Sequence, residues 1–166
     1  MYGLGDRHSQ TQTSVETHLW WNGGWQLHWH RVVAYQPSVL RLGTHSLPLP
    51  EDRWTELAVK GDFAQASNGR HGIAIQSLAG FHRLKANESD PQKRTHILTW
   101  HSLILTAETE KVTGEVHLLA LVYTGLNENE RVPWKVTSTG EGRLTLQHPL
   151  LGEWQVAHPE LPKLAV

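Results

Sequence analysis

The chain has 166 residues, enough for one domain with a buried core, and no cysteine, so disulfides and thiolate chemistry are excluded. Its formal net charge of −1 at pH 7 offers no basic surface to a nucleic acid or an acidic membrane, and we expect neither as a partner. No apolar stretch reaches transmembrane length, and the first residues lack the apolar core of a signal peptide. The sequence as written therefore predicts a soluble chain, and it leaves the compartment unknown.

The domain is expected to lie between two irregular ends. Residues 1–13 carry Gly3, Gly5 and a polar run, which is typical of an interior loop and suggests a piece of a longer protein. A single β-sandwich domain is expected over 14–158. Pro159 and Pro162 predict that residues 159–166 run along the surface as a tail, because each proline lacks a backbone donor.

Residues 16–30 carry the strongest local signal, because two alternating segments flank Asn22, Gly23 and Gly24. Asn and Gly tolerate the positive φ of a tight turn, so the pattern predicts a β-hairpin. We take these three residues as the loop, since this register gives one largely apolar face. The facing pairs on that face would be Trp21–Trp25, Leu19–Leu27 and Thr17–Trp29.

The opposite face of this hairpin would be polar, and it is the candidate site. Its facing pairs would be Trp20–Gln26, His18–His28 and Glu16–His30. Three imidazoles and a carboxylate within reach of one ion suit zinc or another divalent metal. A sugar-facing surface with Trp20 as the stacking platform and His18, His28 and His30 beside it is the second interpretation. A half-solvated polar face without a ligand is the third.

Short strand-like segments continue to the end of the chain, and no segment shows ten residues of helical periodicity. Pro37 is expected to end the strand that begins at Trp25. Residues 95–106 and 114–124 have apolar side chains on both faces, which is typical of strands in the middle of a layered structure. The fold class predicted is all-β, an antiparallel β-sandwich of about ten strands. The further expected strands span 38–42, 54–59, 62–66, 72–79, 132–137, 143–147 and 153–157.

The order of these signals resembles a known family over roughly residues 14–125. The resemblance rests on the runs Gly-Trp-Gln-Leu-His-Trp-His-Arg-Val (24–32), Arg-Leu-Gly (41–43), Gly-Ile-Ala-Ile-Gln-Ser-Leu-Ala-Gly-Phe (72–81) and Arg-Thr-His-Ile-Leu-Thr-Trp-His-Ser-Leu-Ile-Leu (94–105). It is similar to the C-terminal β-sandwich of bacterial heparinase II/III-like proteins, a family filed as a domain of unknown function. Members join this sandwich to an α/α-toroid, and relatives include glycoside hydrolases and polysaccharide lyases.

The resemblance implies an accessory module of a carbohydrate-active protein. The main catalytic groups of such proteins lie largely on the toroid, which is outside this sequence, so no catalytic residue is carried over. The chain alone is then expected not to be a complete enzyme. The implied partners are a polysaccharide and an α/α-toroid domain.

Two other functions are compatible with the residues. A small cupin-like metal-binding β-barrel protein or enzyme would use His18, His28, His30 and Glu16. The motif departs from the cupin pattern, because Ala34 and Tyr35 stand where a glutamate would follow. A structural sandwich that pairs into a homodimer, with no cofactor or ligand, is the remaining alternative.

Overall fold

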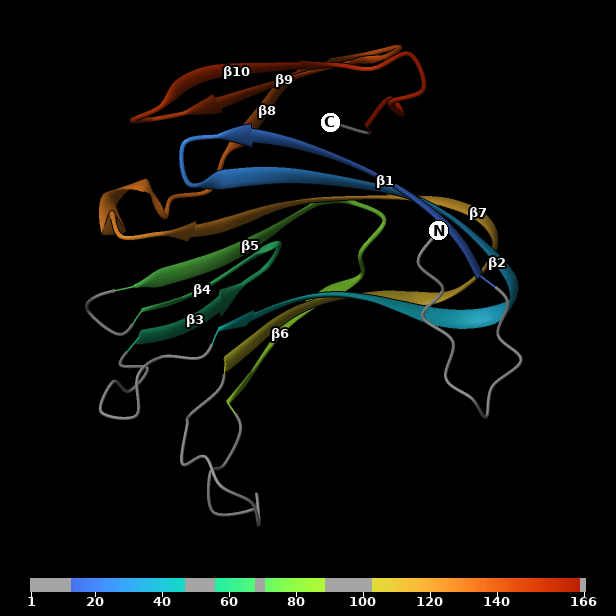
Figure 1. Ribbon diagram of the computed structural model, residues 1–166, viewed down its shortest axis with the longest axis horizontal. Helices are drawn as coiled ribbons and strands as arrows, with labels where there is room; N and C mark the ends of the chain where they lie inside the picture. The colour runs from blue at the N-terminus through green and yellow to red at the C-terminus, as the bar shows by residue number, and fades with distance from the viewer. Residues whose placement is uncertain (1–12, 47–55, 68–70, 89–102, 165–166) are drawn as a thin grey trace.

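The computed structural model describes residues 13–46, 56–67, 71–88 and 103–164. They form antiparallel sheets, so the expected all-β fold is confirmed (Figure 1). The first sheet has seven strands in the order β1-β2-β7-β5-β4-β3, with β6 also paired to β7, and the second has the order β10-β9-β8. The first-sheet strands are β1 (Thr13–Asn22), β2 (Trp25–Ser46), β3 (Glu56–Lys60), β4 (Phe63–Ser67), β5 (Gly72–Ala79), β6 (Arg83–Glu88) and β7 (Leu103–Gly125).

The second sheet consists of β8 (Lys135–Gly140), β9 (Arg143–His148) and β10 (Gly152–Ala157). A short 3-10 helix, η2 (Glu128–Glu130), lies between β7 and β8. No helix that could cross a membrane occurs in the part of the chain described.

Two long strands, β2 and β7, run through the whole first sheet and bend it over on itself (Figure 1). The second half of β7 pairs with the start of β2 and with β5. We call these segments, together with β1, β4 and β3, the upper limb. The first half of β7 pairs with β6 and with the end of β2. We call these three segments the lower limb. Gly114 takes a φ of +84° between the two halves of β7, a conformation that favours glycine.

The prediction that Pro37 ends a strand was wrong, and so was the separation of 103–106 from 114–124, because both lie in β7. Residues 95–102 of that expected strand lie outside the described residues. β2 continues past Pro37 because its register shifts between Ala34 and Ser38, so the proline stands in a bulge and needs no ladder donor. The missing N–H therefore marks the bend of a strand, not its end.

The described residues form two apolar cores. One lies between the limbs and is built from β4, β5, β6 and β7, with Ile75 and Leu105 fully buried. The larger core lies between the upper limb and the three-stranded sheet, and four of its residues are tryptophans. Burial of one such side chain contributes about 2–3 kcal/mol. These tryptophans are Trp25, Trp29, Trp134 and Trp154.

The C-terminal residues join the larger core, so the expected surface tail over 159–166 is corrected for its described part. Leu161 and Leu164 are buried, and the backbone N–H of Gly142 donates to the carbonyl of Leu161. The prolines in this segment remove backbone donors, but they do not prevent the neighbouring leucines from packing against the sheet. The segment thereby covers the upper limb beside the hairpin.

Candidate functional site

The β1–β2 hairpin turns through two residues, Gly23 and Gly24, so the predicted three-residue loop was wrong. Asn22 pairs with Trp25 directly. Gly23 takes a φ of +58°, and a Cβ on Gly24 would lie 2.5 Å from Cε2 of Tyr123, which explains both glycines. The whole of β1 is thereby shifted by one residue against β2, and a shift by one exchanges the two faces of a strand.

This register separates the four residues expected to meet. His18 pairs with Trp29 and so lies on the face toward the three-stranded sheet, which we call the outer face. His28 pairs with Leu19 and His30 with Thr17, which places both imidazoles on the opposite, inner face of the hairpin. The predicted facing of His18 with His28, and of Glu16 with His30, is therefore corrected.

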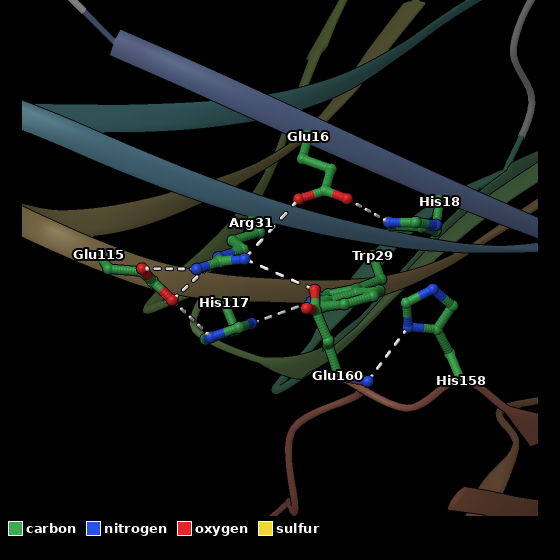
Figure 2. Close-up of polar contacts among 8 residues, drawn as sticks. All are labelled: Glu16, His18, Trp29, Arg31, Glu115, His117, His158 and Glu160. Atoms are coloured by element: carbon green, nitrogen blue, oxygen red, sulfur yellow. Dashed lines mark hydrogen bonds and ion pairs between the residues drawn. The ribbon is translucent and has the colours of Figure 1, made fainter. Parts of the chain in front are cut away.

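The outer face carries a connected set of polar and aromatic side chains from β1, β2, β7 and the C-terminal segment (Figure 2). We call it the Arg31 cluster. It consists of Glu16, His18, Trp29, Arg31, Glu115, His117, His158 and Glu160.

Arg31 is the centre of this cluster. Its Nε donates to Oε1 of Glu115 at 3.0 Å and its Nη2 to Oε2 of the same carboxylate at 3.1 Å, a bidentate pair. Nη1 lies 3.5 Å from Oε2 of Glu160 and 3.9 Å from Oε2 of Glu16. The hydrogen bond from Arg31 lowers the pKa of Glu115, and the same bond raises the pKa of Arg31. One cation thus holds three carboxylates together, one of them from the C-terminal segment.

Aromatic rings form the floor of the cluster. The His18 ring stacks on the Trp29 indole with centroids 4.7 Å apart, and His158 tilts against His18 at 4.4 Å. The indole Nε1–H of Trp29 donates to Nδ1 of His117 at 3.1 Å. Nε2 of His117 lies 3.4 Å from Oε1 of Glu115, which fits the tautomer that carries its proton on Nε2.

Glu16 and His18 remain together, as a carboxylate–imidazole pair with 3.0 Å between Oε1 and Nε2. Glu16 is half-exposed and His18 is partly buried over Trp29. Such a pair has the chemistry of a general acid or base. Its contacts on this face go to Arg31, to Trp29 and to the His158 ring of the C-terminal segment, so the cluster mainly fastens that segment to the sheet.

The inner face of the hairpin is more exposed and less charged. Trp21 is 63% exposed, and Leu19 and Val15 on the same side of β1 are also exposed. Opposite them, Nε2 of His28 bonds Oε1 of Gln26 at 3.1 Å. The face therefore combines an open apolar strip with neutral hydrogen-bonding groups.

The two inner-face histidines are uncharged at neutral pH. Burial lowers the pKa of His28 to about 4, with a further contribution from the nearby His30, and burial also lowers the pKa of His30. The ring centroids are 5.8 Å apart, and Nδ1 of His30 bonds Oγ1 of Thr17 at 2.9 Å. Nε2 of His30 is buried and has no hydrogen-bond partner among the described residues.

The proposed metal ligands are split between the faces, Glu16 and His18 on one and His28 and His30 on the other. Among the residues that the structure describes, no group of three or more His, Asp or Glu side chains is arranged to hold a metal ion. The geometry on which the cupin-like interpretation depended is therefore not formed in this part of the chain.

The tryptophans also exchange roles relative to the sequence prediction. Trp25 and Trp29 are fully buried as expected. Trp21, expected in the core, is exposed, while Trp20, expected as the stacking platform, packs against the larger core beside His18. The two-residue turn accounts for both differences, because it places even-numbered residues of β1 over the core.

Sequence reasoning missed the central role of Arg31 and the part played by Glu115, His117 and His158. Residues 31, 117 and 158 come from three distant segments, so no local spacing marks them. The one usable signal was the pair Glu115 and His117, which stand two apart and therefore share a face of one strand.

The class that the structure defines is an all-β protein with one bent antiparallel sheet and a second sheet packed on it. No family model matches the chain. No curated protein matches it either. The expected membership of the heparinase-like family therefore stays a prediction.

Among solved structures, the chain is similar to heparan sulfate lyase HepC from Pedobacter heparinus, with 13% identity and a TM-score of 0.49 over 92% of this chain and 27% of that chain. It is also similar to a mutant of that lyase, with 14% identity and a TM-score of 0.48 over 82% of this chain and 22% of that one. The chain spans about a quarter of the length of these lyases.

Proposed function

We propose that this chain is a non-catalytic β-sandwich module of a carbohydrate-active protein, and that its inner face contacts a polysaccharide. The observation that carries the proposal is the exposed indole of Trp21, which lies beside neutral hydrogen-bonding groups. A sugar ring presents an apolar face that stacks on an indole, and its hydroxyls bind neutral donors and acceptors. Gln26 lies directly across from Trp21, and the uncharged His28 is bonded to it.

The same face supports the second part of the proposal, a neighbouring α/α-toroid domain. Val15 and Leu19 extend the apolar strip along β1, which is an edge strand of its sheet. Exposed apolar side chains along one face of an edge strand are typical of an interaction surface.

Oligosaccharide titration of the full chain, followed by amide chemical shifts, tests the glycan contact. The panel contains cellohexaose, chitohexaose and an unsulfated uronate hexasaccharide. We expect one of them to shift the amides around Trp21, and Trp21→Ala to weaken that binding by at least about 10-fold, the factor that corresponds to 1.4 kcal/mol. Tyr35→Ala is the matched control, because Tyr35 lies on β2 and its side chain is 62% exposed. This substitution should not change binding.

Binding that survives Trp21→Ala, or falls equally with Tyr35→Ala, would overturn the glycan contact. The toroid is tested by reading the DNA that flanks the coding sequence for an in-frame toroid segment. When the two are expressed as one chain, Leu19→Asp should lower the toroid's protection from proteolysis. Sedimentation that instead shows a concentration-dependent homodimer, broken by Leu19→Asp, would assign the strip to self-association.

A further inference from the structure

A second charged cluster lies on the lower limb, away from the hairpin. Arg41 on β2 and Arg83 on β6 both pair in register with Glu108 of β7, so the three residues form one row across three neighbouring strands. Lys85 stands two residues beyond Arg83 on β6 and therefore on the same face. We call these four residues the Glu108 cluster.

Glu108 is surrounded by the three cations. Nε of Arg41 donates to Oε1 at 2.7 Å, while Nε of Arg83 at 3.0 Å and Nζ of Lys85 at 2.7 Å lie on Oε2. The Glu108 side chain is 6% exposed, whereas the Arg41 and Arg83 side chains are 62% and 59% exposed. The carboxylate is thus covered by the groups that it holds, and those groups face the solvent.

The pKa of Glu108 is lowered to about 2, first by the hydrogen bond from Lys85 and then by that from Arg41. The carboxylate is therefore ionised at any physiological pH. Three cations against one carboxylate leave a net charge of +2 in the cluster. Glu110 follows on the same strand and lies against His82, with Nδ1 of His82 at 3.4 Å from its Oε1.

Each guanidinium binds Glu108 through Nε. The two Nη groups of Arg41 and of Arg83 have no acceptor among the described residues, and they carry most of the donors of these side chains. Guanidinium groups recognise sulfate, phosphate and carboxylate oxygens through such paired N–H donors. A buried carboxylate that fixes the Nε sides would leave these donors oriented before a ligand arrives.

We propose that Arg41, Arg83 and Lys85 form a binding site for a tetrahedral oxyanion, a sulfate or phosphate group, and that Glu108 is its positioning residue. The site is independent of the inner face, because it lies on the lower limb and uses none of the hairpin residues. The group can be a free inorganic anion or a sulfate ester on a polysaccharide. Both present the same oxygens to the two guanidinium groups.

Calorimetric titration of the full chain at constant ionic strength and pH 7 tests the site. The ligands are sodium sulfate, sodium phosphate, a sulfated hexasaccharide and its desulfated counterpart. We expect Arg41→Gln and Arg83→Gln each to weaken binding by about 10-fold and Lys85→Gln by about 3-fold, since charge-assisted hydrogen bonds are lost. Stronger binding of the sulfated hexasaccharide than of sulfate assigns the ester, and equal binding assigns the free anion.

Glu108 supplies the decisive comparison. If net charge alone attracted the anion, Glu108→Gln would bind it more tightly. Positioning predicts the reverse, weaker binding by at least about 3-fold, while Glu110→Gln removes the same charge nearby and leaves binding unchanged or slightly stronger. A thermal melt accompanies each variant, and Glu108→Asp, which withdraws the carboxylate but keeps its charge, replaces Glu108→Gln if that variant fails to fold.

The proposal is overturned if no anion binds the native chain, or if Arg41→Gln and Arg83→Gln bind as the native chain does. Tighter binding by Glu108→Gln would overturn the role assigned to Glu108. Loss of binding of the sulfated hexasaccharide in Trp21→Ala but not in Arg41→Gln would place the anion at the hairpin instead.

Discussion

The Arg31 cluster and the Glu108 cluster use the same two strands in opposite ways. Around Arg31 one cation meets three carboxylates, and around Glu108 one carboxylate meets three cations. Arg31 reaches the C-terminal segment through Glu160, so its partners belong to two layers. The partners of Glu108 all stand on adjacent strands of one limb.

The difference teaches where each cluster can act. The Arg31 cluster is closed by chain contacts, because its carboxylates and rings contact one another across the layers. In the Glu108 cluster the central carboxylate is buried, while the two arginine side chains are exposed to solvent. The first arrangement fastens the fold, and the second presents charge to a ligand.

The largest expected effect breaks the floor of the Arg31 cluster. Trp29→Ala should lower the free energy of unfolding by about 3–5 kcal/mol, because Trp29 is fully buried and its loss leaves a cavity under His18 and His158. Trp21→Ala is the matched control on the same hairpin and should change stability by less than about 0.5 kcal/mol. Urea unfolding measures both. Similar losses in the two variants would contradict the assignment of the faces.

Acid pH should separate the inner-face histidines from the Glu108 cluster. His28 has a pKa lowered to about 4 from 6.5, so the unfolded chain binds its proton first and stability falls as pH drops from 6.5 toward 4. The slope is at most about 1.4 kcal/mol per pH unit, and partial exposure of the ring reduces it. Glu108 has a pKa lowered from 4.5 to about 2, so its contribution is present above 4.5 and is lost between 4.5 and 2.

Melting temperatures measured from pH 7 to pH 2 check this order. His28→Asn should reduce the slope of the profile above pH 4, where His30 still contributes, and leave the lower part unchanged. Glu108→Gln should reduce the slope only below 4.5, where Glu115 still contributes. A His28→Asn profile that matches the native chain throughout would show that the imidazole is not desolvated in solution.

The smallest expected effect compares two arginines of β2. Arg31→Gln removes the one cation among three carboxylates, which then repel one another, so the melting temperature should fall. Arg41→Gln leaves Glu108 with two cations and relieves repulsion between them, so the fall should be smaller. Thermal melts at low and high salt measure the difference, which should shrink as salt screens the exposed groups. An equal fall for both would contradict the contrast between the clusters.

The sequence predicted strands well where their side chains alternate and their ends carry turn residues. The all-β class and the antiparallel arrangement followed from these patterns. The expected strands over 62–66, 72–79, 143–147 and 153–157 agree in position with β4, β5, β9 and β10. The register of the hairpin did not follow, because both two-residue and three-residue loops fit Asn22-Gly23-Gly24. The choice depends on the close approach of Gly24 to Tyr123, a residue 99 positions later in the chain.

The site was predictable only where its residues are neighbours in sequence. Glu16 and His18 stand two apart and do pair, because alternation places them on one face. His158 and Glu160 reach the same face through the path of the C-terminal segment, and Arg83 reaches Glu108 through strand pairing. No local pattern encodes either approach, since each is a property of topology.

The bend of β2 and β7 has a consequence for cooperativity. Both limbs contain β2 and β7, so neither limb can separate from the other without disrupting strands that also build the larger core. Local opening at the edges, β1 or β3, costs one ladder, whereas opening at the centre requires the layers to come apart together. We therefore expect the bend near Pro37 and Gly114 to set the distance between the upper and lower limbs.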